Sequence, residues 1–183
     1  MNTLFNSAKS ILLLSAFSFA LMGCSNETVL DLQEETLKSD QSELSARNGT
    51  QLHFNTTLSG KNAVPPIATK AVGQGIVKIS KDEAKIHYKI TTANIENVSA
   101  AHFHMAPAGQ NAGVVAPLYS NPAHPSGPAN GVLAEGDITA ETLGGGEVGA
   151  EKLYDLIIAI RSGNIYINVH TSAHGGGEIR GQL

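Results

Sequence analysis

The sequence predicts an all-β fold, an antiparallel β-sandwich with one short α-helix, on the strength of three observations. The 183 residues include 19 glycines and seven prolines but no tryptophan, and only 15% are charged, which is typical of a turn-rich β domain. From residue 50 onward, apolar residues recur at every second position in short runs roughly ten residues apart. One later segment instead has the periodicity of an amphipathic helix.

Alternation of apolar and polar residues defines the predicted strands. Leu52, Phe54 and Leu58 alternate with polar residues in the first run, as in a strand with one buried face. The second and third runs are separated only by the polar Lys81-Asp82-Glu83, which predicts a hairpin. A proline-rich stretch, 121–128, lacks ladder donors and is predicted as a surface loop. The predicted strands are 51–58, 76–80, 84–92, 98–105, 114–119, 131–138, 164–171 and 178–183.

The predicted helix covers residues 150–162. Its apolar residues follow the i, i+3, i+4, i+7 spacing of a buried helix face, and they are Leu153, Leu156, Ile157 and Ile160. Gly163 stands where a helix often ends, and the glycines at 144–146 form a flexible lead-in. The predicted architecture is therefore a Greek-key sandwich, immunoglobulin-like or superoxide-dismutase-like, with this one helix added.

The N-terminus has the features of a lipoprotein signal peptide over residues 1–23. A basic residue, Lys9, precedes an apolar run of 12 residues, 11–22, which is too short for a membrane-spanning helix of about 20 residues. The run leads into Leu21-Met22-Gly23-Cys24, which resembles the bacterial lipobox, and Cys24 is the only cysteine of the chain. We therefore expect lipidation of Cys24 and a lipid-anchored protein of the bacterial cell envelope, at the outer membrane, either periplasmic or surface-exposed.

An acidic segment, 24–49, follows as a flexible tether. It contains six acidic and two basic residues, whereas residues 50–183 contain ten acids and nine bases. The net charge of −4 therefore belongs to the tether, and the domain over residues 50–183 is nearly neutral. Such a charge balance argues against a nucleic-acid partner.

Four motifs of the domain, in order and at matching spacing, resemble those of the chordin-type (CHRD) domain family. They are Leu58-Ser59-Gly60-Lys61-Asn62-Ala63-Val64-Pro65-Pro66, the Ala101-His102-Phe103-His104 segment with Ala106-Pro107-Ala108-Gly109, Ile165 to Thr171, and Gly177 to Leu183. Two positions differ from the family pattern. Ala63 replaces the usual acid before Val-Pro-Pro, and Met105 replaces a glycine.

The resemblance implies a secreted or envelope-anchored β domain more than it implies a particular activity. It favours a non-enzymatic binding or structural module whose partner is an extracytoplasmic protein or glycan. The residues agree with this, because the sequence has no nucleophile elbow, no P-loop and no H-E-x-x-H helix. No catalytic residue is predicted.

The alternative function is that of a metalloprotein. His102 and His104, two positions apart on a predicted strand, project to one face, and His170 lies on another strand. Three imidazoles with an open fourth position would suit copper or zinc. This pattern also resembles the copper side of copper/zinc superoxide dismutase, which implies redox chemistry of that type, although the chain lacks that enzyme's disulfide and an obvious bridging histidine.

A structural role for these histidines is the competing interpretation. The ring nitrogens of His102 and His170 could instead bond to backbone carbonyls or to Glu178, and Asn168 could hold a loop. Glu178 and Arg180, also two positions apart, are expected to form an ion pair or a cross-strand lock within this polar cluster. His53 and His87 lie on polar strand faces and are predicted to be surface residues.

Overall fold

The computed structural model describes residues 51–122 and 126–183. The predicted signal peptide, Cys24 and the tether lie outside these residues. The strands are β1 (His53–Ser59), β2 (Val72–Ile79), β3 (Lys85–Glu96), β4 (Val98–Met105), β5 (Val114–Ser120), β6 (Pro128–Thr139), β7 (Ile165–Thr171) and β8 (Ile179–Gln182). A short 3-10 helix, η1 (Gly60–Asn62), follows β1, and the α-helix α2 (Gly146–Arg161) lies between β6 and β7.

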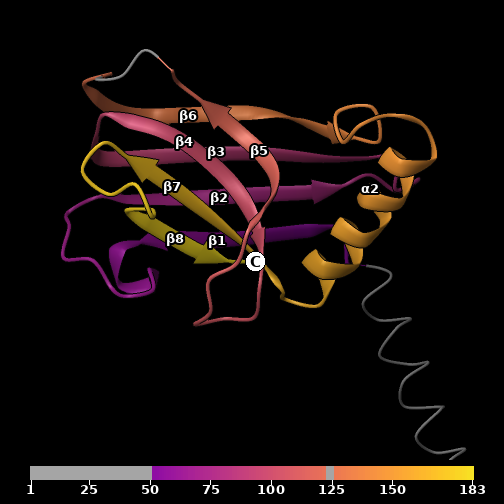
Figure 1. Cartoon of the computed structure of the whole chain (residues 1–183), viewed down its shortest axis with the longest axis horizontal. Helices are drawn as coiled ribbons and strands as arrows, with labels where there is room; N and C mark the ends of the chain where they lie inside the picture. Colours follow the sequence, from indigo (N-terminus) through magenta and orange to yellow (C-terminus); the bar gives the residue numbers. More distant parts are fainter. Residues whose placement is uncertain (1–50, 123–125) are drawn as a thin grey trace, which may run out of the picture. The chain divides into compact units, whose positions relative to one another are not determined.

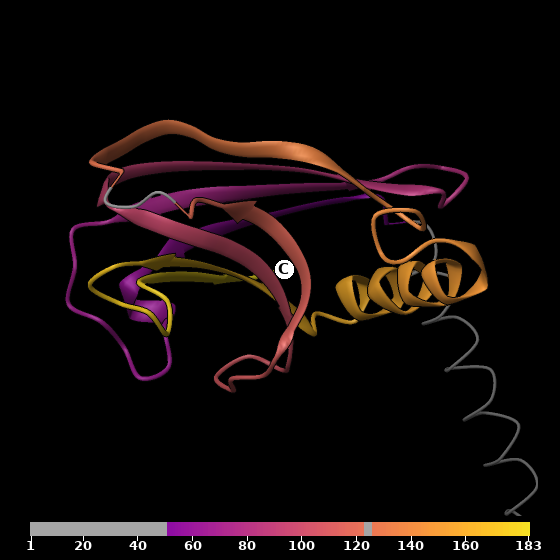
Figure 2. The same ribbon diagram turned by 45° about the horizontal axis from the view of Figure 1, so that its top comes forward.

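All eight strands belong to one antiparallel sheet with the order β5-β4-β7-β8-β1-β2-β3-β6. The sheet curls back on itself, so that β4 and β5 lie across from β3 and β6 (Figures 1 and 2). The Tyr88 hydroxyl of β3 donates a hydrogen bond of 2.8 Å to the Leu118 carbonyl of β5, which joins the two ends of the sheet. The result is a nearly closed, sandwich-like barrel, which confirms the predicted all-β fold with one helix.

The interior of the barrel is apolar. Alternate residues of the strands point inward, and the helix adds the face that its periodicity predicted, including Leu153, Leu156, Ile157 and Ile160. The helix ends at Arg161, and Gly163 has a φ of 70°, which is the conformation expected just past a helix end. Within the described residues, no helix is long and apolar enough to cross a membrane.

Four boundaries differ from the sequence prediction by three or more residues, and one of them is the end of β3, at Glu96 rather than at residue 92. β2 begins at Val72 rather than at residue 76, because Gly73 and Gly75 have no side chains to reveal the alternation. β6 begins at Pro128, which was assigned to the surface loop, and β6 is an edge strand where a missing donor is tolerated. The helix begins at Gly146, within the glycines expected to form a lead-in.

Candidate functional site

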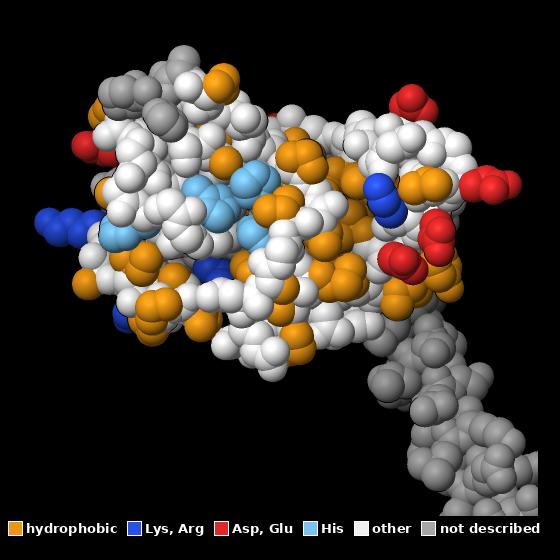
Figure 3. All heavy atoms as spheres, viewed as in Figure 1, with side chains coloured by type: hydrophobic (Ala, Val, Ile, Leu, Met, Phe, Trp, Pro, Cys, Tyr) orange, Lys and Arg blue, Asp and Glu red, His pale blue; other side chains and the backbone are white. Residues whose placement is uncertain are grey.

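The three predicted histidines lie together on the outer face of the sheet. β4 pairs with β7 so that His102 is opposite Asn168 and Ala100 is opposite His170. His102 and His170 are therefore diagonal neighbours on adjacent strands, which long side chains can bridge. Phe103, which lies between His102 and His104 in the sequence, points into the apolar core. A group of histidine side chains is visible over β4 and β7 in Figure 3.

The imidazole rings of His102, His104 and His170 face one another closely. The ring centroids are 4.9 Å apart for His102 and His170 and 5.8 Å apart for each of the other two pairs. His102 Nδ1 lies 3.1 Å from His170 Nε2. One nitrogen from each ring can be chosen so that all three lie within 4.8 Å of one another. The structure thus brings together the three residues that the sequence pattern selected.

Two backbone carbonyls fix the tautomers of this cluster. His104 Nδ1 lies 2.9 Å from the Ala112 carbonyl, and His170 Nδ1 lies 2.9 Å from the Gly175 carbonyl. A carbonyl only accepts hydrogen bonds, so each Nδ1 carries the proton and each Nε2 keeps its lone pair in the neutral ring. The carbonyl bond of His170 was predicted under the structural interpretation, and that of His104 was not. Both bonds are also of the kind that orients a metal-binding histidine.

His104 Nε2 is buried and has no hydrogen-bond partner. The His104 side chain is 6% exposed, and its ring stacks on that of Tyr166 at 4.9 Å and 9°. A buried acceptor without a partner costs about 1–3 kcal/mol. The lone pair of this nitrogen therefore needs a ligand that the described residues do not supply.

Burial keeps His102 and His104 neutral. Burial first, and then the neighbouring rings of His170 and His104, together lower the pKa of His102 to about 4. Burial also lowers the pKa of His104. Both rings are thus uncharged near neutral pH, with lone pairs available for a metal ion.

The predicted polar cluster divides into two separate contacts. Asn168 donates to the Gly176 carbonyl at 2.9 Å and so holds the 172–177 loop over the histidines, as expected. Glu178 does not bond to a histidine, because its two oxygens accept hydrogen bonds from the Thr69 and Thr171 hydroxyls. Arg180 does not pair with Glu178 and instead donates to Gln110, Asn111 and Gln182.

Tyr166 is a component of the site whose role the sequence did not reveal. Its ring lies between two functional groups, since His104 stacks on it and the Arg180 guanidinium lies 3.5 Å from its centroid. Its hydroxyl accepts a hydrogen bond from the Ala112 amide at 3.1 Å, which places the carbonyl that holds His104. The only signal in the sequence is its position on the same strand face as Asn168 and His170.

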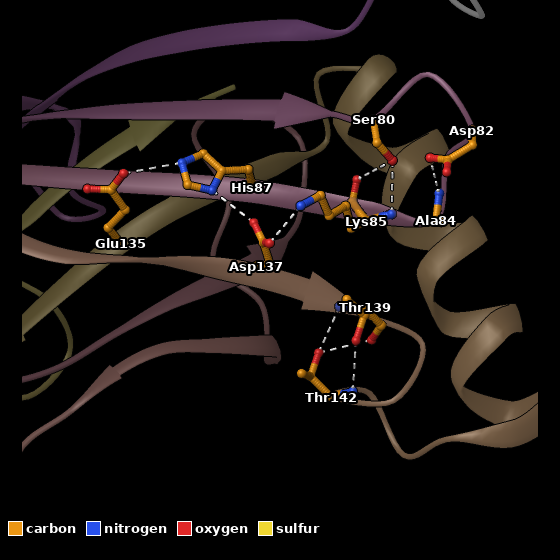
Figure 4. A network of polar contacts seen from close by, with 9 residues as sticks. All are labelled: Ser80, Asp82, Ala84, Lys85, His87, Glu135, Asp137, Thr139 and Thr142. Carbon is orange, nitrogen blue, oxygen red and sulfur yellow. Dashed lines mark hydrogen bonds and ion pairs between the residues drawn. The ribbon is translucent and has the colours of Figure 1, made fainter.

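The remaining strand histidines are surface residues, as predicted. His53 is exposed. His87 lies between Glu135 at 3.4 Å and Asp137 at 2.9 Å on the outside of β3 and β6 (Figure 4). Lys85 and Lys89 pair with the same two acids. These exposed charged contacts explain the position of His87 on the surface, and no bound ligand is needed to explain it.

A protein-family model, the CHRD domain, matches residues 54–183. The chain belongs to the CHRD domain family. The matched residues include the whole sheet apart from His53 and all three clustered histidines. No curated protein and no solved structure matches the chain significantly. Membership of the CHRD family supports a binding or structural module.

Proposed function

We propose that the CHRD domain of this chain is a non-enzymatic module that binds one copper or zinc ion through His102, His104 and His170. The observation that carries the proposal is the partnerless, buried Nε2 of His104 beside two other imidazoles. A metal ion satisfies this nitrogen, whereas the structural interpretation leaves it unsatisfied.

The distances within the cluster suit a shared ion. Two nitrogens that bind Zn²⁺ tetrahedrally at about 2.0–2.1 Å lie about 3.3–3.4 Å apart. His102 Nδ1 and His170 Nε2 are 3.1 Å apart, and one nitrogen from each of the three rings can be chosen so that all lie within 4.8 Å of one another. Closing that gap requires a movement of about 1.5 Å, and His102 and His170, both partly exposed, leave the fourth position open to solvent.

Metal binding requires a change of tautomer at His102. In the metal-free chain, His170 Nε2 carries a lone pair, so His102 Nδ1 donates its proton across the 3.1 Å contact. When an ion occupies the site, the proton moves to His102 Nε2 and both facing nitrogens become ligands. The tautomer change itself releases no proton, because the proton only moves from one nitrogen of His102 to the other.

Titration calorimetry of the full chain with Cu²⁺ and with Zn²⁺ tests the proposal and identifies the preferred ion. We expect one ion per chain for the wild type and a loss of affinity of at least about 100-fold for His170→Ala and His102→Ala, since each removes one ligand. His87→Ala is the matched control, because it also removes a strand histidine but should bind metal normally. Equal affinity in all four proteins would refute the site.

We further propose that this module is held at the bacterial outer membrane by lipid on Cys24, with residues 24–49 as the spacer. The support is the short apolar run, the lipobox-like Leu21 to Cys24 and the acidic segment that follows. Cys24→Ser should leave an uncleaved precursor or release the protein from membranes, whereas unchanged membrane partitioning would refute lipidation. Besides the membrane, we propose an extracytoplasmic protein or glycan as the partner that the module binds at the envelope.

A further inference from the structure

Arg180 is a buried cation without an anionic partner. Its side chain is 2% exposed, and its three hydrogen bonds go to the neutral oxygens of Gln110, Asn111 and Gln182. A guanidinium has five N–H donors, so the Nε–H and one Nη2–H have no acceptor among the described residues. Those two donors are the kind that a carboxylate binds as a pair.

No carboxylate in the described part of the chain lies within ion-pair distance of Arg180. The acid nearest in sequence, Glu178, is engaged by the hydroxyls of Thr69 and Thr171. The ring of Tyr166, 3.5 Å from the guanidinium carbon, supplies partial compensation. A buried charge in these surroundings gains strongly from an added anion, because its desolvation cost is otherwise only partly offset.

A cavity of about 570 Å³ opens beside Arg180. This volume is in the range of small-molecule sites. The wall includes Lys61 and Arg180 but no acidic residue, together with Thr57, Asn62 and Gln182. Two cations without a nearby acid make the cavity selective for anions.

Ala63 is part of the wall of this cavity. It is 7% exposed and lines both the large cavity and a neighbouring one of about 170 Å³, as Arg180 also does. The motif that this segment resembles has an acid at the position of Ala63. In this chain the methyl group of Ala63 supplies no carboxylate to the two cavities that Arg180 also lines.

We propose that the cavity between β1, η1 and Arg180 binds an acidic sugar, whose carboxylate pairs with Arg180 and Lys61. The sugar hydroxyls have partners in the exposed Thr57 and in the Asn62 amide oxygen, since Asn62 uses only its Nδ2 to bond the Thr57 carbonyl. This inference names the partner class of the proposed binding module and rests on it. The site shares no ligand residue with the histidine cluster, so the two can fail separately.

The test uses ¹⁵N-labelled full chain titrated with D-glucuronate and, as a neutral counterpart, D-glucose. We expect glucuronate to shift the Arg180 Nε–H resonance saturably and glucose to leave it unchanged. Lys61→Ala, an exposed substitution that should not affect folding, weakens binding roughly two- to fivefold. Equal responses to the two sugars, or a saturable response unaffected by Lys61→Ala, would overturn the proposal.

Ala63→Glu supplies the carboxylate within the chain and is the sharpest variant. We expect it to abolish glucuronate binding and to raise the melting temperature above that of Ala63→Gln, which is equal in size but uncharged. Its Zn²⁺ and Cu²⁺ affinity should equal that of the wild type, which also shows that it folds. Unchanged glucuronate binding in Ala63→Glu would refute the acidic-sugar site. A wild-type chain that binds no Zn²⁺ or Cu²⁺ would refute only the histidine site.

Discussion

The loop over the histidine cluster offers a prediction that links its packing to metal binding. Gly177 has a φ of 111°, and a Cβ atom added there would overlap the amide group of Asn168. That amide holds the Gly176 carbonyl, and the adjacent Gly175 carbonyl holds His170 Nδ1. Gly177→Ala should therefore strain the backbone, break the Asn168 bond and release His170 from its orientation.

The magnitude follows from these contacts. The unfavourable backbone conformation costs about 1–3 kcal/mol, and loss of the Asn168 bond adds about 1 kcal/mol. The total of about 2–4 kcal/mol corresponds to a fall in melting temperature of roughly 8–16 °C for a domain of this size. Metal affinity should fall about 10- to 100-fold, as is typical when a partner of a ligating histidine is lost.

The neighbouring glycine supplies the control. A Cβ atom added at Gly176 meets nothing within 4 Å, and its φ is outside the region that favours glycine. Gly176→Ala should therefore keep both the melting temperature and the Cu²⁺ and Zn²⁺ affinity close to the wild type. Scanning calorimetry and metal titration measure the pair, and indistinguishable values for Gly177→Ala and Gly176→Ala would refute the reasoning.

Three further outcomes follow from individual contacts. Because the pKa of His102 is lowered to about 4 in the folded chain, the unfolded chain binds more protons between pH 6.5 and 4. The free energy of unfolding of the metal-free protein should therefore fall by up to about 3 kcal/mol as the pH falls through this window. A free energy of unfolding in urea that stays constant across this window would contradict the burial of His102. Tyr88→Phe removes the bond to Leu118 that joins the ends of the sheet, so we expect a loss of about 1 kcal/mol in urea unfolding with metal affinity unchanged. Arg161→Met removes the 2.7 Å contact with Glu83 that ties the helix to the β2–β3 hairpin and should lower the free energy of unfolding by about 1–2 kcal/mol. Glu83→Gln should lower it less, since the uncharged amide still accepts a hydrogen bond, and an equal loss would show that the hydrogen bond contributes nothing without the charge.

The sequence predicted the strands wherever side chains alternate. β4 has the predicted bounds, and apolar and polar residues alternate over its second half, from Ala101 to Met105. The alternation did not reveal the start of β2, because Gly73 and Gly75 have no side chains and the packing around them leaves no room for any. A Cβ atom at Gly75 would overlap the side chain of Ile167 on the far side of the barrel, and such a contact depends on how the sheet curls.

The site was predictable only in part, for a related reason. Strand periodicity places His102 and His104 on one face, and the convergence of His170 depends on which strands become neighbours. The carbonyls of Ala112 and Gly175 belong to loops, whose conformations leave no periodic signal. For Arg180, a cross-strand lock was one expected outcome, and the structure shows that it ties β8 to the 106–111 loop rather than to Glu178.

Anomalous scattering from crystals of the metal-loaded full chain tests the central claim most directly. Data collected on both sides of the copper or zinc absorption edge locate the bound ion without assumptions about ligands. We predict one anomalous peak about 2.0–2.1 Å from His104 Nε2 and from a nitrogen of both His102 and His170. A peak at another position, such as the His87 ladder, or a cluster that stays empty while His104 Nε2 remains unpartnered, would contradict the account.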